Sequence, residues 1–325
     1  MPSPNLLNRI HIPTIATRQA RFTDTFGLEG MSVLLYLSLL VTGIPLMVLY
    51  TPTAVSAGES IRAITYIAPY GWLLRNLHYW AAVLLLLTSA LHLLRVVLTG
   101  GYKPPRRFNW LLGLAALLLS GLLSFSGYVL RWDVDTVGAL TVIVNLAQQT
   151  PLLGDWLYGL LVGGAEISDV TLGRFYTWHI VGLSVPLLLV GWRVFHVSRD
   201  GKKIEEGAAL LALLCLLLGL ALWLDAPLAP AVDGLSVPLT AVTPTITTPW
   251  FLLWIQALLR YLPPLWAGVV IPLGVVLILA LLPWTLDRTT TGTAVWFNRE
   301  GRLAQGVVLL LLGGIVALTL LEWWG

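Results

Sequence analysis

Apolar residues along this chain gather into long runs, and short polar segments separate one run from the next. A run of about 20 mainly apolar residues is long enough to cross the hydrocarbon core of a bilayer as an α-helix. Runs of that length occupy 31–50, 77–98, 109–131, 176–197, 207–225, 264–284 and 303–321. The pattern therefore predicts an all-α integral membrane protein with seven transmembrane helices.

Two of the segments between these runs are long enough to hold structure of their own. Residues 132–175 contain Gly, Pro and short apolar runs, which predicts surface helices. Residues 226–263 are rich in Pro and Thr and end in an aromatic amphipathic stretch over 249–260. Long loops in compact domains are usually functional. We therefore expect a shaped site on the membrane face that the two segments share.

The composition agrees with a membrane protein. Hydrophobic residues make up 57% of the chain and charged residues 11%, with a mean hydropathy of +0.84, whereas soluble domains are about 25% charged. The first 30 residues are polar and include Pro2, Pro4 and Pro13. This start lacks the apolar core of a signal peptide, so we expect no cleavable signal peptide.

The basic residues predict the orientation. A cytoplasmic N-terminus places 14 of the 19 basic residues on the cytoplasmic side, as the positive-inside rule requires. These 14 residues are Arg9, Arg18, Arg21, Arg95, Lys103, Arg106, Arg107, Arg193, Arg199, Lys202, Lys203, Arg288, Arg299 and Arg302. We expect a multi-pass protein of the cell (inner) membrane. The net charge of +3 reflects this topology and gives no indication of nucleic-acid binding.

Four of the five histidines lie inside apolar runs, His78 and His92 in one, His179 and His196 in another. The 14-residue step from His78 to His92 is about 21 Å and nearly four helical turns, so both imidazoles leave one face at different depths. A buried histidine is often only a hydrogen-bonded core residue, but ionisable groups at membrane depth are costly and usually functional. The pattern predicts two haems stacked across the membrane between two helices.

The cysteine count limits how such haems are held. Cys215 is the single cysteine and lies inside an apolar run, which excludes a disulfide framework and a cysteine metal site. No Cys-X-X-Cys-His motif for covalent attachment is present. We therefore expect two haem b groups and no covalent haem.

Glycines and arginines accompany the histidines. Gly30, just before the first run, and Gly43 are 13 apart, and Gly113 and Gly127 are 14 apart in the third run, which would let a flat macrocycle approach these helices at two depths. Membrane helices are rich in glycine anyway. Arg75 and Arg95 lie three residues outward from His78 and His92, where a haem propionate would point. The alternative is that the two arginines are interfacial anchors.

The chain divides at a charged stretch that follows the fourth run. Residues 1–200 contain four spans and all four membrane histidines, and predict a four-helix di-haem domain. Residues 201–325 contain three further spans and no histidine.

Several segments resemble the cytochrome b family of quinol-oxidising bc and bf complexes, and the resemblance covers nearly the whole chain. They are Gly71-Trp-Leu-Leu-Arg-Asn-Leu-His78, His92-Leu-Leu-Arg-Val-Val-Leu-Thr-Gly-Gly-Tyr-Lys-Pro104, Gly127-Tyr-Val-Leu130, Thr171-Leu-Gly-Arg-Phe-Tyr-Thr-Trp-His179 and Ala257-Leu-Leu-Arg260. The run Thr99-Gly-Gly-Tyr-Lys-Pro104 and the seven spans look more like the bf form, with the three-span subunit IV fused here onto the four-span b6 subunit.

The resemblance implies how the histidines pair. His78 with His179 would bind the outer haem, and His92 with a second histidine of the fourth span would bind the inner haem. In the family the fourth-span ligands are 14 or 15 residues apart, but His179 and His196 are 17 apart, and Arg193, which has no lone pair for iron, stands at the 14 spacing. Pro186 stands ten before His196, as in the family, so a bulge or kink between His179 and Pro186 would absorb the extra residues. We expect His196 to be the ligand, with Arg193 near the inner haem. The alternative is a five-coordinate or missing inner haem.

The resemblance also implies an outer quinol site, formed by Tyr128, Arg131, Arg174, Trp250 and Phe251. The family's Pro-Glu-Trp-Tyr is replaced by Thr248-Pro249-Trp250-Phe251, so the glutamate that would take a quinol proton is missing. Asp133, Asp135 or water would have to substitute. Arg131 replaces a family proline, and Gly27 stands where the bf form has the cysteine of an extra haem, so we expect that haem to be absent.

A charged segment follows the fourth span on the cytoplasmic side. We expect Arg199, Asp200, Lys203, Glu205 and Glu206 to line an inner quinone site, where they could deliver protons to a reduced quinone. A plain solvated loop is the alternative.

The sequence favours two functions. The first is the di-haem subunit of a Rieske-type quinol oxidoreductase, a homodimer with a Rieske iron-sulfur protein and a c-type cytochrome or other redox subunits as partners, using quinone as substrate. The second is a non-bifurcating anchor that links the quinone pool to a different redox enzyme, which the missing glutamate favours. A haem-free transporter is disfavoured, because the spans show no discontinuous polar helix and no acidic residue at mid-membrane.

Overall fold

The computed structural model describes residues 26–197, 203–230, 232 and 248–324, and for 192–197 and 203–205 only the backbone. All regular secondary structure in this part of the chain is helical. The long helices are α3 (Leu28–Leu49), α5 (Gly71–Leu98), α6 (Arg107–Val129), α11 (Lys203–Trp223), α13 (Ile271–Thr285) and α14 (Arg302–Trp324).

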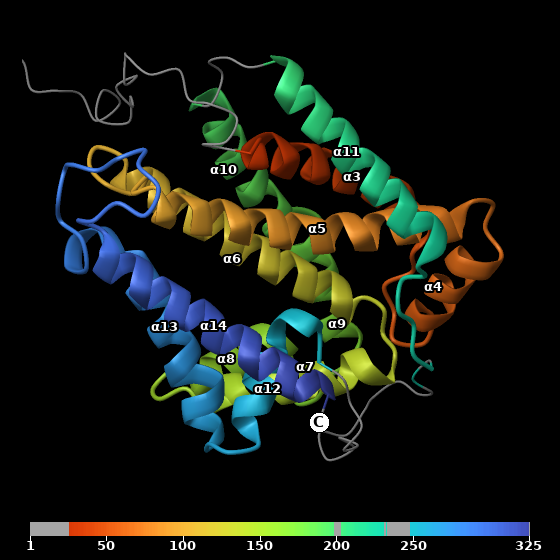
Figure 1. Cartoon of the computed structure of the whole chain (residues 1–325). Coiled ribbons are helices and arrows are strands. Elements are labelled where there is room, and N and C mark those ends of the chain that lie inside the picture. The colour runs from red at the N-terminus through yellow and green to blue at the C-terminus, as the bar shows by residue number, and fades with distance from the viewer. Residues whose placement is uncertain (1–25, 198–202, 231, 233–247, 325) are drawn as a thin grey trace, which may run out of the picture.

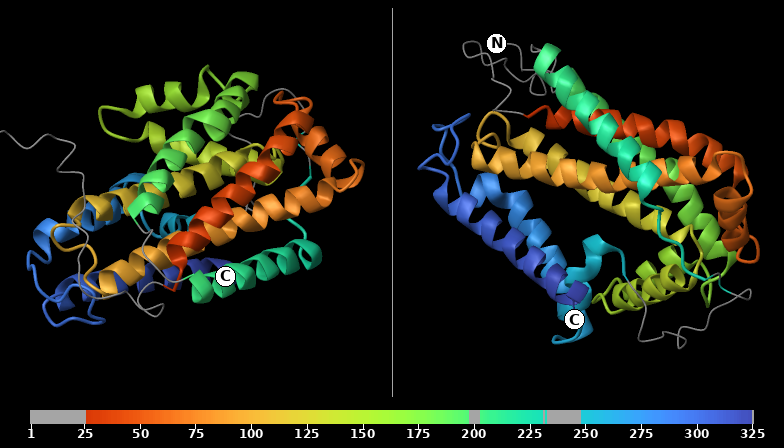
Figure 2. Two further views of the ribbon diagram at one scale, coloured as in Figure 1. Left: turned by 90° about the horizontal axis from the view of Figure 1, so that it is seen from above. Right: turned by 45° about the vertical axis from the view of Figure 1, so that its right-hand side comes forward.

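Helices α5 and α6 form the centre of the molecule. In Figures 1 and 2, α3 and α11 lie on one side of this pair and α13 and α14 on the other, and packing of α11 on α5 and of α13 on α6 agrees with the views. The fifth span, α11, therefore packs on α5 and α3 and lies away from the last two helices.

Six helices of the described residues are long and apolar enough to cross a membrane. They correspond to the first, second, third, fifth, sixth and seventh predicted spans, and their ends differ from the sequence-based ones by a few residues. The fourth predicted span consists of three consecutive pieces, α9 (Asp169–Thr177), η1 (Trp178–Gly182) and α10 (Ser184–Val197). Each piece is shorter than a bilayer is thick.

The break in this segment is a π-helix that contains His179. Leu183 donates its backbone N–H to Trp178, five residues back, at 2.8 Å. Pro186 has no N–H, so it cannot donate to the Gly182 carbonyl as an α-helix requires. The Ser184 hydroxyl bonds to the carbonyl of Ile180. The bulge that the long histidine spacing predicts between His179 and Pro186 is therefore present.

Short helices gather at one end of the bundle. They are α4 (Ala57–Tyr66), α7 (Val134–Gln148), α8 (Gly154–Val162), η2 (Trp250–Leu252), α12 (Leu253–Leu259) and η3 (Trp266–Val270). Asp133 begins α7 with a capping box, because its carboxylate accepts from Thr136 N–H at 3.0 Å and the Thr136 hydroxyl lies 3.0 Å from Asp133 N–H. The helices predicted within 132–175 are confirmed, and the aromatic stretch of 249–260 forms η2 and α12.

Three apolar clusters hold these elements together. The first packs α7, α8 and α9 under the end of α6. The second joins α5 and α6 to α13 and α14, with Trp110 donating its indole N–H to the Leu279 carbonyl at 2.7 Å. The third joins α3, α5, α10 and α11. The first and third clusters flank the segment that carries His179, so packing from both sides sets its position.

Candidate haem and quinone sites

His78 of α5 and His179 of η1 face each other inside the bundle. Their ring centroids are 6.2 Å apart, and the ring planes make an angle of 63°. The two residues are 101 positions apart in the sequence, so the pair exists only because α5 and the fourth-span segment pack around α6.

A threonine hydroxyl sets the tautomer of His78. Thr42 Oγ1 lies 3.0 Å from His78 Nδ1 and donates its own proton to the Ser38 carbonyl at 2.7 Å. The hydroxyl oxygen must then accept a hydrogen bond from the ring, so Nδ1 carries the hydrogen. The lone pair of neutral His78 is therefore on Nε2.

A serine does the same for His179. Ser126 Oγ lies 3.0 Å from His179 Nδ1 and donates to the Leu123 carbonyl at 2.9 Å. The Leu123 carbonyl itself lies 3.2 Å from Nδ1 and can only accept. Nδ1 of His179 therefore carries the hydrogen, and its lone pair is also on Nε2.

These contacts fit two histidines that would together hold one haem iron. A metal-binding histidine usually donates its second N–H to a nearby oxygen, which fixes its tautomer and orientation. Imidazole nitrogens bind metals at about 2 Å and lie about 1 Å from the ring centroid, so two rings on one ion have centroids roughly 6 Å apart. The observed 6.2 Å agrees with that spacing.

Two of the four predicted glycines lie against this pair. A Cβ on Gly43 would come within 3.2 Å of His78 Cε1, and a Cβ on Gly127 within 2.7 Å of His179 Cε1. The missing side chains thus leave room for the imidazoles themselves. Gly113 lies against Leu93, next to His92, and Gly30 makes an ordinary contact with Leu210 of α11.

His92 lies further along α5 in a charged setting. Arg95 Nη2 is 3.3 Å from His92 Nδ1 and 3.4 Å from Glu29 Oε1 at the start of α3, and Glu29 Oε1 is 3.8 Å from His92 Nδ1. The sequence analysis missed Glu29. The side chains of Arg193 and His196, the predicted partners of His92, lie outside the described residues.

Arg75 is buried, with 8% of its surface exposed, and donates to the carbonyl of Pro227. Neighbouring side chains hold the same segment, because Asn76 accepts from Ala226 N–H at 2.9 Å and Trp80 donates to the Leu224 carbonyl at 2.8 Å. Residues 224–227 therefore lie along the first turns of α5, one turn before His78. The sequence analysis expected Arg75 at a haem propionate and had no indication of this segment.

Three of the predicted outer-site residues meet in the first apolar cluster. Tyr128 and Phe251 pack on it from α6 and η2, and the Arg131 guanidinium lies 4.8 Å from the centroid of the Tyr128 ring. Arg131 is also paired with Asp133 at 2.7 Å. Trp250 packs edge-on against Phe251, with centroids 5.7 Å apart.

Asp133, a possible substitute for the missing glutamate, already has several partners. Oδ2 accepts from Arg131 and from Ala229 N–H at 3.1 Å, and Oδ1 caps α7 through Thr136 N–H. The residue is 1% exposed. Its carboxylate is therefore needed to hold the loop and poorly placed to exchange protons.

The other predicted quinone-site residues lie apart from this cluster. Arg174 donates to the carbonyls of Gly159 and Leu160 and so ends α8. Glu206 is exposed on α11. Arg199 and Asp200 lie outside the described residues, as do the side chains of Lys203 and Glu205.

Comparison with known proteins identifies the family. The family model Cytochrome b/b6/petB matches residues 16–199, and the model Cytochrome b(C-terminal)/b6/petD matches residues 239–325. This chain belongs to the cytochrome b/b6 family. It carries the b6-like part and the subunit IV-like part on one polypeptide.

Relatives among characterised proteins agree. The chain is 31% identical to cytochrome b/c1 of Bradyrhizobium diazoefficiens over 315 residues, which cover 90% of this chain but only 45% of that protein. It is 36% identical over 163 residues to cytochrome b6 of Cyanidium caldarium, covering 49% of this chain and 76% of that protein. For cytochrome b6 of Heliobacterium mobile the identity is 37% over 171 residues, covering 53% and 79%. The chain thus spans less than half the length of the Bradyrhizobium relative.

The fold also has a counterpart among solved structures. A chain of a hyperthermophilic respiratory complex III superposes with a TM-score of 0.76 at 21% identity, covering 95% of this chain and 85% of that one. The match confirms the helical architecture of this cytochrome b-family protein.

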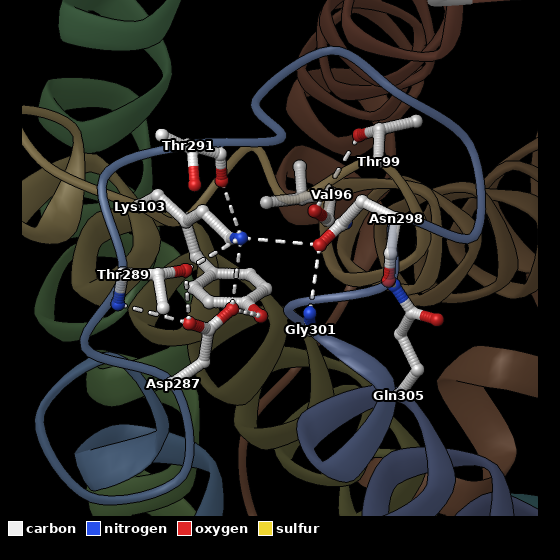
Figure 3. Close-up of polar contacts among 10 residues, drawn as sticks. Val96, Thr99, Lys103, Asp287, Thr289, Thr291, Asn298, Gly301 and Gln305 are labelled. Carbon is white, nitrogen blue, oxygen red and sulfur yellow. Dashed lines mark hydrogen bonds and ion pairs between the residues drawn. The ribbon is translucent and has the colours of Figure 1, made fainter.

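The two family segments are joined by a polar cluster that the sequence analysis missed (Figure 3). It lies where the loop after α5 meets the loop between α13 and α14. Lys103 is fully buried, and its Nζ is 3.2 Å from Asp287 Oδ2. The same ammonium donates to Thr289 Oγ1 at 2.9 Å, the Thr291 carbonyl at 2.6 Å and Asn298 Oδ1 at 3.1 Å. We call Tyr102, Lys103, Asp287, Thr289, Thr291 and Asn298 the polar clamp.

The clamp keeps Asp287 ionised. Burial alone would raise the pKa of this carboxyl, but hydrogen bonds from Tyr102 at 2.6 Å, from Thr289 and from Lys103 lower it overall. Burial and the bond to Asp287 raise the pKa of the Tyr102 hydroxyl, which therefore stays a donor. Sequence reading placed Lys103 with the basic residues of a cytoplasmic loop, because the acid that buries it lies 184 positions away.

Proposed function

We propose that this protein is the di-haem cytochrome b subunit of a membrane quinol oxidoreductase and moves electrons between two quinone sites on opposite sides of the membrane. The observation that carries the proposal is the His78–His179 pair, in which both Nε2 atoms have lone pairs and both Nδ1 atoms are held by hydroxyls. Haem, when bound between such ligands, supplies a one-electron carrier.

The residues around the histidine pair have distinct roles. Thr42 and Ser126 orient the imidazoles and hold their hydrogens on Nδ1, and Gly43 and Gly127 leave space for the rings. We assign the second haem to His92 and His196, with Arg95 and Glu29 balancing charge beside it. The π-helix of the fourth span supports this assignment, since it lies where the extra residues between the two ligands must be absorbed.

The wider assembly belongs to the same proposal. Seven spans, with the fourth formed by α9, η1 and α10, would place a four-helix di-haem domain over 1–200 and three more helices over 201–325. The N-terminus would be cytoplasmic in the inner membrane. We propose a homodimer that works with a Rieske iron-sulfur protein and a c-type cytochrome.

The outer site favours a second candidate, a conduit that does not bifurcate electrons. Pro249 stands where the family has glutamate, and the Asp133 carboxylate is already bound by Arg131, Thr136 and Ala229. An apolar quinol pocket without the family glutamate lacks the usual acceptor for the protons that oxidation releases. Such a subunit would exchange electrons with the quinone pool on behalf of another redox enzyme.

Purification from native membranes separates the two candidates. The chain is captured through a tag under mild detergent, the copurifying subunits are identified by mass spectrometry, and quinol-dependent reduction of a c-type cytochrome is measured. A Rieske protein with inhibitor-sensitive turnover selects the oxidoreductase. A different redox subunit, with haem reduction by quinol but no Rieske protein, selects the conduit.

A further inference from the structure

Two arginines, one at the start of α6 and one in the loop after α13, lie beside one tryptophan next to the polar clamp. The Arg107 guanidinium of α6 lies 5.7 Å from the centroid of the Trp284 ring of α13. Arg288, one turn later, donates from Nε to the Trp284 carbonyl at 2.6 Å. The clamp brings these residues together, because Lys103 and Asp287 stand only four and one positions from the two arginines.

Neither arginine has an acidic partner among the described residues. Arg107 makes no hydrogen bond or ion pair there, and its Nε is buried without an acceptor. The nearby carboxylate of Asp287 is fully buried and already holds Lys103 and Tyr102. A buried guanidinium donor without an acceptor is unfavourable, so an external oxygen acceptor would stabilise this arrangement.

The surface that continues from Trp284 is apolar and exposed. Leu277, Leu281 and Trp284 follow one face of α13 at intervals of four and three residues, and Arg288 lies three residues past the end of this helix. All four residues are exposed. Phe108, beside Arg107, is 54% exposed. A ligand at this place would thus contact two cations at one end and an apolar stripe along α13.

We propose that Arg107, Arg288 and Trp284 form a binding site for one anionic phospholipid, with its phosphate at the two guanidiniums and an acyl chain along Leu281 and Leu277. Guanidinium groups match phosphate oxygens in geometry and charge. Tryptophan is the residue that favours the headgroup level of a membrane. The site belongs to the basic end of the bundle, and anionic lipids concentrate in the cytoplasmic leaflet that basic loops face.

The test measures lipid retention by the purified full-length protein. The detergent-solubilised holoprotein is stripped of lipid, incubated with vesicles of phosphatidylglycerol in phosphatidylcholine, repurified, and analysed for bound phosphatidylglycerol by native mass spectrometry. The test variant is Arg107→Gln with Arg288→Gln. The matched control is Arg299→Gln with Arg302→Gln, which removes the same charge from exposed residues of the same end.

We expect the test variant to bind phosphatidylglycerol about 25-fold more weakly, at about 5-fold per arginine, and the control to change much less. Trp284→Leu should also weaken retention of phosphatidylglycerol. The haem spectrum shows whether each variant is folded, and Trp284→Leu provides the test if the double arginine variant is not. An equal loss of bound phosphatidylglycerol in the test and control variants would show that general surface charge, and not this site, retains the lipid, and would overturn the proposal. Unchanged retention, or displacement by inorganic phosphate as effective as by short-chain phosphatidylglycerol, would overturn the proposal.

Discussion

At the scale of single residues, the hydroxyl partners define the histidine pair as much as the histidines do. Thr42 and Ser126 each precede a glycine that lies against an imidazole, Gly43 or Gly127. One position therefore orients the ring and the next leaves space for it. A short polar residue before a glycine at membrane depth is a signal that the sequence carried and that helical spacing alone did not reveal.

The two glycines should tolerate alanine to different degrees. Gly127→Ala places a methyl group 2.7 Å from a ring carbon of His179, whereas in Gly43→Ala the contact to His78 is 3.2 Å. Overpacking of this kind costs about 1–3 kcal/mol, and the His179 ring cannot move freely because Ser126 holds it.

The measurement is haem content together with thermal stability of the purified variants. Gly127→Ala should lose most of one haem, and Gly43→Ala should retain more of it. Gly121→Ala is the control, since a Cβ there meets nothing within 4 Å. Full haem content in Gly127→Ala would show that the bound pair has a different geometry.

Residue-level prediction from sequence was limited by contacts between distant segments. The histidines and glycines were found from spacing, because a helix repeats every 3.6 residues. The actual partners of Arg75, Arg174 and Lys103 are Pro227, two carbonyls of α8, and Asp287. No local pattern links these residues, so their roles follow only from the packed structure.

At the scale of elements, the most informative segment is the interrupted fourth span. Hydropathy predicts one helix over 176–197, but the described backbone changes from α to π at Trp178 and back to α at Ser184. Short π-helices occur mostly within α-helices and often at functional sites. The spacing of 17 residues predicted a bulge, and the missing N–H of Pro186 explains why the chain can adopt it here.

Removal of one residue from the π-helix should disturb the histidine pair. Deletion of Val181, which is 55% exposed, allows a regular α-helix and turns His179 by about 100° relative to α10. His179 then leaves Ser126 and His78, so one haem of low-spin character should be lost while the other remains.

Val181→Ala serves as the control, because it changes the same side chain without changing the register. Haem content is measured as the pyridine haemochrome, and spin state by electron paramagnetic resonance. If the deletion variant retained both haems, the π-helix would not set the position of His179.

At the scale of the whole molecule, the polar clamp joins the two family segments at one end and the first apolar cluster, through Phe251, joins them at the other. The fifth span does not contribute to this junction, because α11 packs on α5 and α3. Hydropathy located the six long apolar helices of the described residues and gave their order. Which spans lie side by side could not be predicted in this way, because the lipid-facing and buried residues of these helices are equally apolar.

Lys103→Met should destabilise the whole protein. It leaves the Asp287 carboxylate buried without its cation, and breaking a buried pair in this way costs about 3–5 kcal/mol. The expected result is a clearly lower midpoint temperature of haem release, measured by visible absorbance.

The double variant Lys103→Met with Asp287→Leu is the comparison for this prediction. An apolar pair of similar volume is often neutral relative to a buried ion pair, so the double variant should regain most of the lost stability. A double variant as unstable as Lys103→Met would mean that the threonine and asparagine contacts of Lys103, rather than its charge pair, hold the junction.

A haem count with spin state tests most directly whether the chain holds two haems between paired histidines. We expect two haem b per chain, both extractable by acid acetone and both low-spin, with His78→Ala losing one and His92→Ala losing the other. One haem per chain, or a high-spin signal of equal weight to the low-spin one, would contradict it.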